Sequence, residues 1–126
     1  MDKKERIESL RSRLLELPNL LQDNRTKRFE SNENKELILD EMKKIEIRIR
    51  EEVYEAKDPE TGKVLYSNQE KRETAIVKSL DNSPAYAELK TRLNIINREI
   101  MNLDIAIDVV KAKLRATESL VQLEVL

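Results

Sequence analysis

The sequence predicts an all-α protein: an antiparallel coiled-coil helical hairpin with a short β-hairpin or turn and a short capped helix at its tip. Three observations predict this fold class. The last third of the chain carries an apolar stripe with alternating steps of four and three residues, the first half carries a stripe of the same period, and turn and cap residues lie between them. Apolar residues at this spacing share one face of a helix and pack against a partner helix.

The composition favours long, solvated helices. Charged residues make up 39% of the 126 residues, with 24 basic and 25 acidic side chains, and the chain holds one glycine and 3% aromatic residues. Leu, Glu, Lys and Arg lose little rotamer freedom in a helix, and so few aromatic residues leave little material for a bulky core. We therefore expect a single elongated helical domain over residues 1–126.

The N-terminal helical segment, 2–17, and the first arm, 18–50, share one pattern, which we call the first-helix stripe. It consists of Leu10, Leu14, Leu17, Leu21, Asn24, Arg28, Ser31, Lys35, Ile38, Met42, Ile45 and Ile49. Pro18 lies inside the pattern, and because proline removes a backbone donor, we expect a kink or a restart of the helix there. The unbroken phase favours one nearly continuous helix from Pro18 to Ile49; the alternative is a loop at 31–34, where the residues are good helix caps.

The tip covers residues 51–83 and begins with turn chemistry. Asp58-Pro59-Glu60-Thr61-Gly62 separates 53–57 from 63–66, and a proline early with a glycine late in such a link predicts a short β-hairpin or an ordered reversal. Ser67 followed by Glu70 matches a capping box. It predicts a helix that ends near Leu80 and turns Ala75, Ile76 and Leu80 towards the core.

The second arm, 84–123, begins with Ser83 as the N-cap and Pro84 at the first helical position. Its apolar ladder, which we call the main stripe, consists of Tyr86, Leu89, Leu93, Ile96, Ile100, Leu103, Ile107, Val110, Leu114, Thr117 and Val121. The similar lengths of the two arms predict that they pair as a hairpin.

The same helix carries a second stripe. It consists of Ile105, Val109, Ala112, Ala116, Leu120 and Leu123. One partner helix cannot cover both stripes, so we expect something else to pack here. Either a second copy of the chain covers the second stripe in a homodimer, or the N-terminal segment folds back at Pro18 and forms a three-helix bundle. Both alternatives stay open, although a kink at Pro18 need not amount to a full reversal.

The sequence offers little catalytic chemistry. Without histidine or cysteine the chain has no imidazole base, no thiolate and no nitrogen or sulfur metal ligand, and one glycine cannot build a phosphate loop. The carboxylate pairs Glu36/Asp40 and Asp104/Asp108 fall outside the apolar stripes, so we expect them to face solvent. We predict no enzymatic activity, no catalytic residues, no metal and no cofactor.

Charge and hydropathy predict neither nucleic-acid nor membrane binding. The net charge of −1 exerts no long-range attraction on polyanions, and no run of residues approaches the ~20 apolar residues of a membrane span. The lack of a secretion signal and of cysteine fits the cytoplasm. One basic patch remains a candidate for contact with a nucleic-acid backbone, although acidic neighbours favour ordinary helix surface. Its residues are Arg25, Lys27, Arg28, Lys111, Lys113 and Arg115.

The residues from the tip onwards also suggest a family. The run Gly62-Lys63-Val64-Leu65-Tyr66-Ser67-Asn68, then Glu70-Lys71-Arg72, Leu80, Pro84-Ala85-Tyr86 and a long Leu/Ile helix, resembles small uncharacterised coiled-coil proteins of phages and mobile elements in Gram-positive bacteria. The resemblance covers residues 45–123. It implies a cytoplasmic, phage- or prophage-encoded protein and carries no activity or site residues. The layout is also similar to prefoldin-type chaperone subunits, from which the capped helix at 68–80 departs.

These observations predict a non-enzymatic protein–protein interaction module, an adaptor or inhibitor whose partner is another protein. A helical rod with a distinctive tip presents extended surface without a pocket. The alternatives are a nucleic-acid-associated accessory factor and a prefoldin-like holdase chaperone. Salt-sensitive retention on DNA or RNA would favour the accessory factor, and suppressed aggregation of an unfolded client would favour the holdase.

Overall fold

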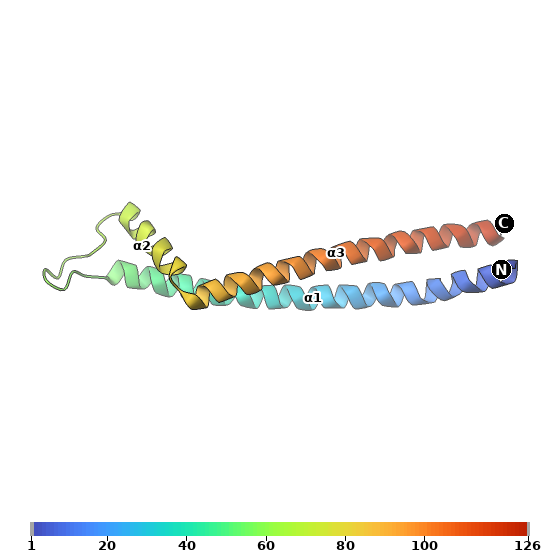
Figure 1. Cartoon of the computed structure of the whole chain (residues 1–126), viewed down its shortest axis with the longest axis horizontal. Helices are drawn as coiled ribbons and strands as arrows, with labels where there is room; N and C mark the ends of the chain where they lie inside the picture. Colours follow the sequence, from blue (N-terminus) through green and yellow to red (C-terminus); the bar gives the residue numbers. More distant parts are fainter. Residues whose placement is uncertain (1, 126) are drawn as a thin grey trace. The chain divides into compact units, whose positions relative to one another are not determined.

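The computed structural model describes residues 2–125 and consists almost entirely of helix. The helices are α1 (Lys3–Glu55), α2 (Gln69–Asp81) and α3 (Pro84–Val125), as Figure 1 shows, and no strand occurs among the described residues. The all-α class is therefore confirmed. Met1 and Leu126, which the predicted domain includes, lie outside the described residues. Within residues 2–125 no helix is both long and apolar enough to cross a membrane.

Contacts within the chain divide it into two units. The first unit combines residues 1–33 with 97–126, and the second unit consists of residues 34–96. Helices α1 and α3 contribute to both units, whereas α2 belongs to the second unit alone. The single domain expected from the composition stays a prediction.

Helix α1 is continuous over 53 residues, with Pro18 inside it. The predicted restart at Pro18 and the alternative loop at 31–34 are wrong, and the continuous helix is confirmed and longer than expected at both ends. Leu14, Leu17 and Leu21 are all partly buried on the two sides of Pro18. Because the apolar stripe keeps its packing across the proline, tertiary contacts offset the missing backbone hydrogen bond.

Burial follows the predicted stripes. No residue of the first-helix stripe and no residue of the main stripe is exposed, including the polar members Asn24, Ser31 and Lys35. Thr117 is 4% exposed, and its hydroxyl donates to the Lys113 carbonyl at 2.7 Å. The only polar side chain buried in the main stripe of the described chain is therefore satisfied within its own helix.

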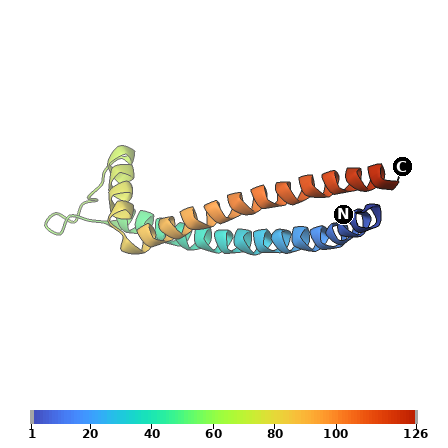
Figure 2. The same cartoon turned by 45° about the vertical axis from the view of Figure 1, so that its right-hand side comes forward.

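In the first unit, the two helical segments lie side by side with both chain ends at the same end of the unit (Figures 1 and 2). Arg6 of α1 forms an ion pair with Glu124 of α3 at 2.9 Å, and Arg28 forms one with Asp104. Leu10, Ile107 and Val110 are the buried hydrophobic residues of this unit.

The second unit holds two hydrophobic clusters. Ile38 and Met42 of α1 surround Leu89 of α3, and Ile45, Tyr86, Leu93 and Ile96 pack against them. Ile49 and Val53 of α1 surround Ile76 of α2, together with Ala75 and Leu80. The predicted apolar side of α2 is therefore confirmed.

Helix α1 continues past the end expected for it. The sequence predicts that residues 53–55 flank a β-turn, but they are helical. The reason is that Val53 follows Ile49 of the first-helix stripe by four residues and is buried against Ile76. Burial outweighs the β propensity of Val53 and Tyr54. Ile49 likewise belongs to the cluster around Ile76 and not to the one around Leu89.

The segment between α1 and α2 holds one isolated antiparallel bridge, between Lys57 and Val64, and no strand. Inside the bridge the Asp58 N–H donates to the Lys63 carbonyl, and the Gly62 N–H donates to the Asp58 carbonyl, both at 2.8 Å. Gly62 has φ 68°, the left-handed conformation expected for it. One bridge is less than the regular hairpin that the sequence allowed.

The helix caps agree with the sequence at α3 and differ by one residue at α2. The Tyr86 N–H donates to the Ser83 hydroxyl at 3.3 Å, so Ser83 caps α3 as predicted. At α2 the cap is Asn68, whose side chain accepts from the Lys71 N–H at 2.9 Å. The predicted capping box of Ser67 with Glu70 is therefore wrong. Asn68 is the residue with extended backbone, and its own carbonyl accepts the first helical bond, from Arg72.

Candidate functional site

The second stripe of α3 is exposed along its whole length. Ile105 is 56% exposed, Val109 and Leu120 are each 45% exposed, and Leu123 is 70% exposed. Ala112 and Ala116 between them are also exposed. A contiguous apolar strip of this kind on a charged surface usually marks an interface, so this is the leading candidate site.

The N-terminal segment does not cover the second stripe. Because α1 is continuous through Pro18, the segment cannot fold back there. Its apolar residues Leu10 and Leu14 belong to the first-helix stripe and are at least partly buried, and Ile7 is partly buried as well. The intrachain three-helix bundle that the sequence left open is therefore wrong, and the stripe remains available to another molecule.

The position of the second stripe follows from helix geometry. Successive residues of an α-helix lie about 100° apart, so Val109 projects to a different side from the buried Val110. The second stripe therefore lies on a different side of α3 from the main stripe, and its members Ala116 and Leu120 border α1 in a hollow that Leu17 also lines. Leu120 lies at its edge, where it lines a shallow hollow beside Leu10 and Arg13.

Charged residues border the second stripe without partners in the described chain. Asp108, Lys113 and Arg115 are exposed, and none of them forms an ion pair with any residue from 2 to 125. A partner that meets the stripe therefore also meets free charges of both signs. The partner should therefore carry charges of both signs beside its own apolar surface.

The predicted basic patch is divided between two levels of the first unit. Arg28 is partly buried and bound to Asp104, whereas Arg25 and Lys27 are exposed. Lys111 begins the other cluster seven residues after Asp104, about 10 Å further along α3. Lys113 accordingly lines a hollow with Leu17, and Arg115 is exposed near it. The register of α3 against α1 thus offsets the two halves of the candidate basic patch along the first unit.

The carboxylate pairs do not converge on a site. Glu36, Asp40 and Asp108 are exposed, and Asp104 is bound to Arg28. No group of three or more acidic residues in the described part of the chain is arranged to hold a metal ion. These carboxylates contribute surface charge and one ion pair between helices.

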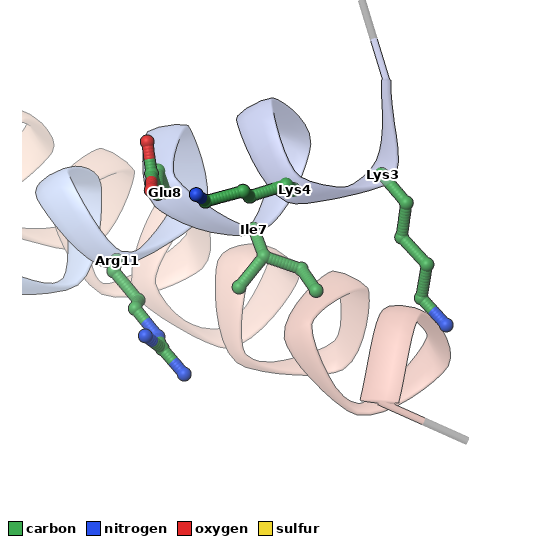
Figure 3. Close-up of a pocket in the computed structure, with 5 residues that line it drawn as sticks. All are labelled: Lys3, Lys4, Ile7, Glu8 and Arg11. Carbon is green, nitrogen blue, oxygen red and sulfur yellow. The ribbon is translucent and has the colours of Figure 1, made fainter.

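The hollows on the surface are shallow and mixed in character. Figure 3 shows one of about 410 Å³ near the start of α1, lined by Lys3, Lys4, Ile7, Glu8 and Arg11. In this view Ile7 points towards α3, while Lys4 and Glu8 lie away from it. All five lining residues belong to the first turns of one helix, α1.

A larger groove of about 700 Å³ runs along α2 in the second unit, and sequence reasoning missed it. Its lining residues are Leu65, Tyr66, Asn68, Glu70, Lys71, Thr74, Ala75 and Lys78. Val64 and Val77, which do not line the groove, are exposed as well. The only sign of this groove in the sequence is the apolar pair Val64-Leu65 directly after the turn. The β-hairpin prediction assigns this pair to a strand and so does not identify Leu65 as groove surface.

Comparison of the chain with protein families, with curated proteins and with solved structures gives no match. The resemblance to phage coiled-coil proteins therefore stays a prediction from the sequence. Function has to be argued from the surface of the molecule itself.

Proposed function

We propose that this protein is a non-enzymatic protein–protein interaction module, an adaptor or inhibitor, that binds its partner through the second stripe of α3. The observation that carries the proposal is the exposure of all six residues of that stripe. Covering each large aliphatic side chain on it would contribute about 1.5–3 kcal/mol. No comparable feature supports a reaction: no group of three or more acidic residues among residues 2–125 is arranged to hold a metal ion.

The module we propose is an antiparallel coiled-coil hairpin with the turn and α2 at its tip. Two observations support this architecture. The first-helix stripe and the main stripe keep steps of three and four without an exposed member, as a coiled coil requires. Inside the first unit, Arg6 meets Glu124 and Arg28 meets Asp104, which is the order of an antiparallel pair.

We also propose a cytoplasmic, phage- or prophage-encoded protein. The absence of cysteine suits a reducing compartment, and the resemblance over residues 45–123 supports the origin. Nucleic-acid binding is the weaker alternative because the two basic clusters are offset and Arg28 is already bound to Asp104.

The substitution Val109→Glu tests the interaction face. It places a charge in the middle of the second stripe at a position that is 45% exposed, so the chain should fold normally by circular dichroism. The matched control is Leu15→Glu, which places the same charge on a 75% exposed leucine of α1 in the same unit. Affinity capture from the host or phage proteome, and sedimentation of the pure protein, give the two measurements.

We expect Val109→Glu to abolish association in at least one of these measurements, while Leu15→Glu leaves it unchanged. Equal behaviour of the two folded variants and the wild-type chain in both measurements would refute the second stripe as the binding face.

A further inference from the structure

We infer that the partner on the second stripe is a second copy of this chain, with the two α3 helices parallel and in register. The inference rests on the proposed function, since it names the partner of the same surface. Three features of the exposed side of α3 support it: a strict heptad repeat, the position of one asparagine, and the distribution of charge.

The exposed side of α3 carries a heptad repeat of its own, which we call the outer seam. One set of positions, seven residues apart, holds Asn102, Val109, Ala116 and Leu123, and the other holds Ile105, Ala112 and Ser119. The steps alternate between three and four residues, and every member is exposed. The outer seam thus adds Asn102 and Ser119 to the second stripe and leaves Leu120 directly beside it. A helix with such a repeat is complementary to an identical helix.

The charges beside the outer seam distinguish a parallel pair from an antiparallel pair centred on Ala112 and Ala116. In a parallel pair, a flanking charge on one helix faces the flanking position five residues later on its partner. Asp108 then faces Lys113 of the second copy, and the two-fold axis repeats the pair. In an antiparallel pair centred on Ala112 and Ala116, Lys113 would face Lys113 and Arg115 would face Arg115 of the second copy. The parallel arrangement therefore pairs Asp108 with Lys113, neither of which forms an ion pair with any residue from 2 to 125.

Asn102 fixes the register. It occupies the same heptad position as Val109, and a single asparagine there is the common device that aligns two parallel helices, because the two amides bond to each other. In the antiparallel arrangement Asn102 would lie beyond the end of the partner's seam. At the centre, Ala112 and Ala116 are small enough to let the two helices approach closely, while Ile105 and Leu123 supply apolar bulk towards the two ends.

Cysteine crosslinking of the full chain tests the direction and the register. The wild-type chain has no cysteine, so Val109→Cys introduces a single thiol. In the parallel pair the two Cys side chains face each other, whereas in the antiparallel pair centred on Ala112 and Ala116 they lie about 15 Å apart along the helix, too far for a disulfide. We expect oxidised Val109→Cys to form a covalent dimer and the matched control Leu15→Cys to stay monomeric.

Charge substitutions test the same pairing without a covalent bond. Lys113→Ala removes both inferred pairs and should weaken the dimer about two- to thirty-fold in sedimentation equilibrium. In the antiparallel arrangement the same change would relieve a repulsion and tighten the dimer. The exchange Asp108→Lys with Lys113→Asp restores both pairs and should restore the wild-type affinity, whereas Asp108→Lys alone should weaken it.

The outcomes separate the inference from the proposed function. A wild-type chain that sediments as a monomer at high concentration, while capture of another protein still depends on Val109, overturns the second copy and leaves the interaction module standing. A dimer that tightens with Lys113→Ala, or that gives no Val109→Cys crosslink, overturns the parallel register. A wild-type chain that sediments as a monomer, and whose capture of other proteins does not change with Val109→Glu, overturns both the inference and the proposed function.

Discussion

The hydroxyl of Tyr86 in α3 donates a hydrogen bond to the carboxylate of Glu46 in α1, with 2.6 Å between the oxygens. Both side chains are partly buried, and Tyr86 also packs against the cluster of Ile38, Met42 and Leu89. The hydrogen bond to Glu46, then burial, and then the negative charge of Glu46 raise the pKa of Tyr86 to about 12. This contact is therefore a pH-sensitive link between two helices of the second unit.

Tyr86→Phe removes the hydrogen bond and keeps the ring. We expect the free energy of unfolding to fall by about 0.5–1.5 kcal/mol near neutral pH. Because the pKa is higher in the folded chain than its ordinary value of 10.0, the contribution of the bond is full below pH 10 and is lost as the pH rises to about 12. Urea unfolding of both proteins across this range measures the difference. A gap that stays constant up to pH 12 would contradict the assignment.

The cap of α2 gives a second prediction. Asn68→Ala removes the acceptor for the Lys71 N–H and should cost about 0.5–2 kcal/mol of stability. The neighbouring Ser67→Ala is the control and should change stability by less than about 0.5 kcal/mol, because its side chain is exposed. Thermal unfolding of both variants decides between them. A larger loss with Ser67→Ala would restore the capping box that the sequence suggested.

The position of this cap shows where sequence reasoning ends. Ser67 and Asn68 are both good cap residues, and the sequence does not say which of them adopts the extended conformation. Contacts around the helix start bear on the choice: the Arg72 guanidinium donates to the Tyr66 carbonyl at 3.2 Å and lies 4.8 Å above the Tyr54 ring. Local patterns contain no information about such contacts, so the helix was predictable and its first residue was not.

The stripes were predictable because periodicity is a local property of one helix. The alignment of residues on α3 with residues on α1 in the first unit was not predictable, because it depends on contacts between the helices. Every member of the main stripe could be read from its spacing within α3. The relative position of the basic clusters depends on the register of α3 against α1, which the ion pair of Arg28 with Asp104 reveals. The second stripe was predictable as an apolar face, and its exposure became known only once the continuity of α1 was established.

Ile76 supports the third prediction. It is 2% exposed and lies between Ile49 and Val53 of α1, so Ile76→Ala leaves a cavity and should cost about 2–5 kcal/mol. The adjacent Val77 is 55% exposed and serves as the control; Val77→Ala should stay within about 0.5 kcal/mol of the wild-type chain. Chemical denaturation measures both. Similar losses for the two variants would mean that α2 does not pack on α1 through Ile76.

Pro18 gives the last prediction, a gain of stability. Inside α1 the proline nitrogen has no hydrogen to donate to the Leu14 carbonyl, and its ring crowds the preceding turn. Alanine at this position restores the donor and has the best helix propensity, and Pro18 is exposed, so no core contact is lost. Pro18→Ala should therefore stabilise the chain by up to about 3 kcal/mol.

The control for this gain is Glu16→Ala, which changes an exposed residue of the same turn region and should alter stability by less than about 0.5 kcal/mol. Thermal and urea unfolding measure both variants. If the helix ended before Pro18 and restarted with the proline in its first turn, the proline would be favourable there and its replacement would lower stability. The sign of the change therefore tests the continuity of α1, on which the exposure of the second stripe depends.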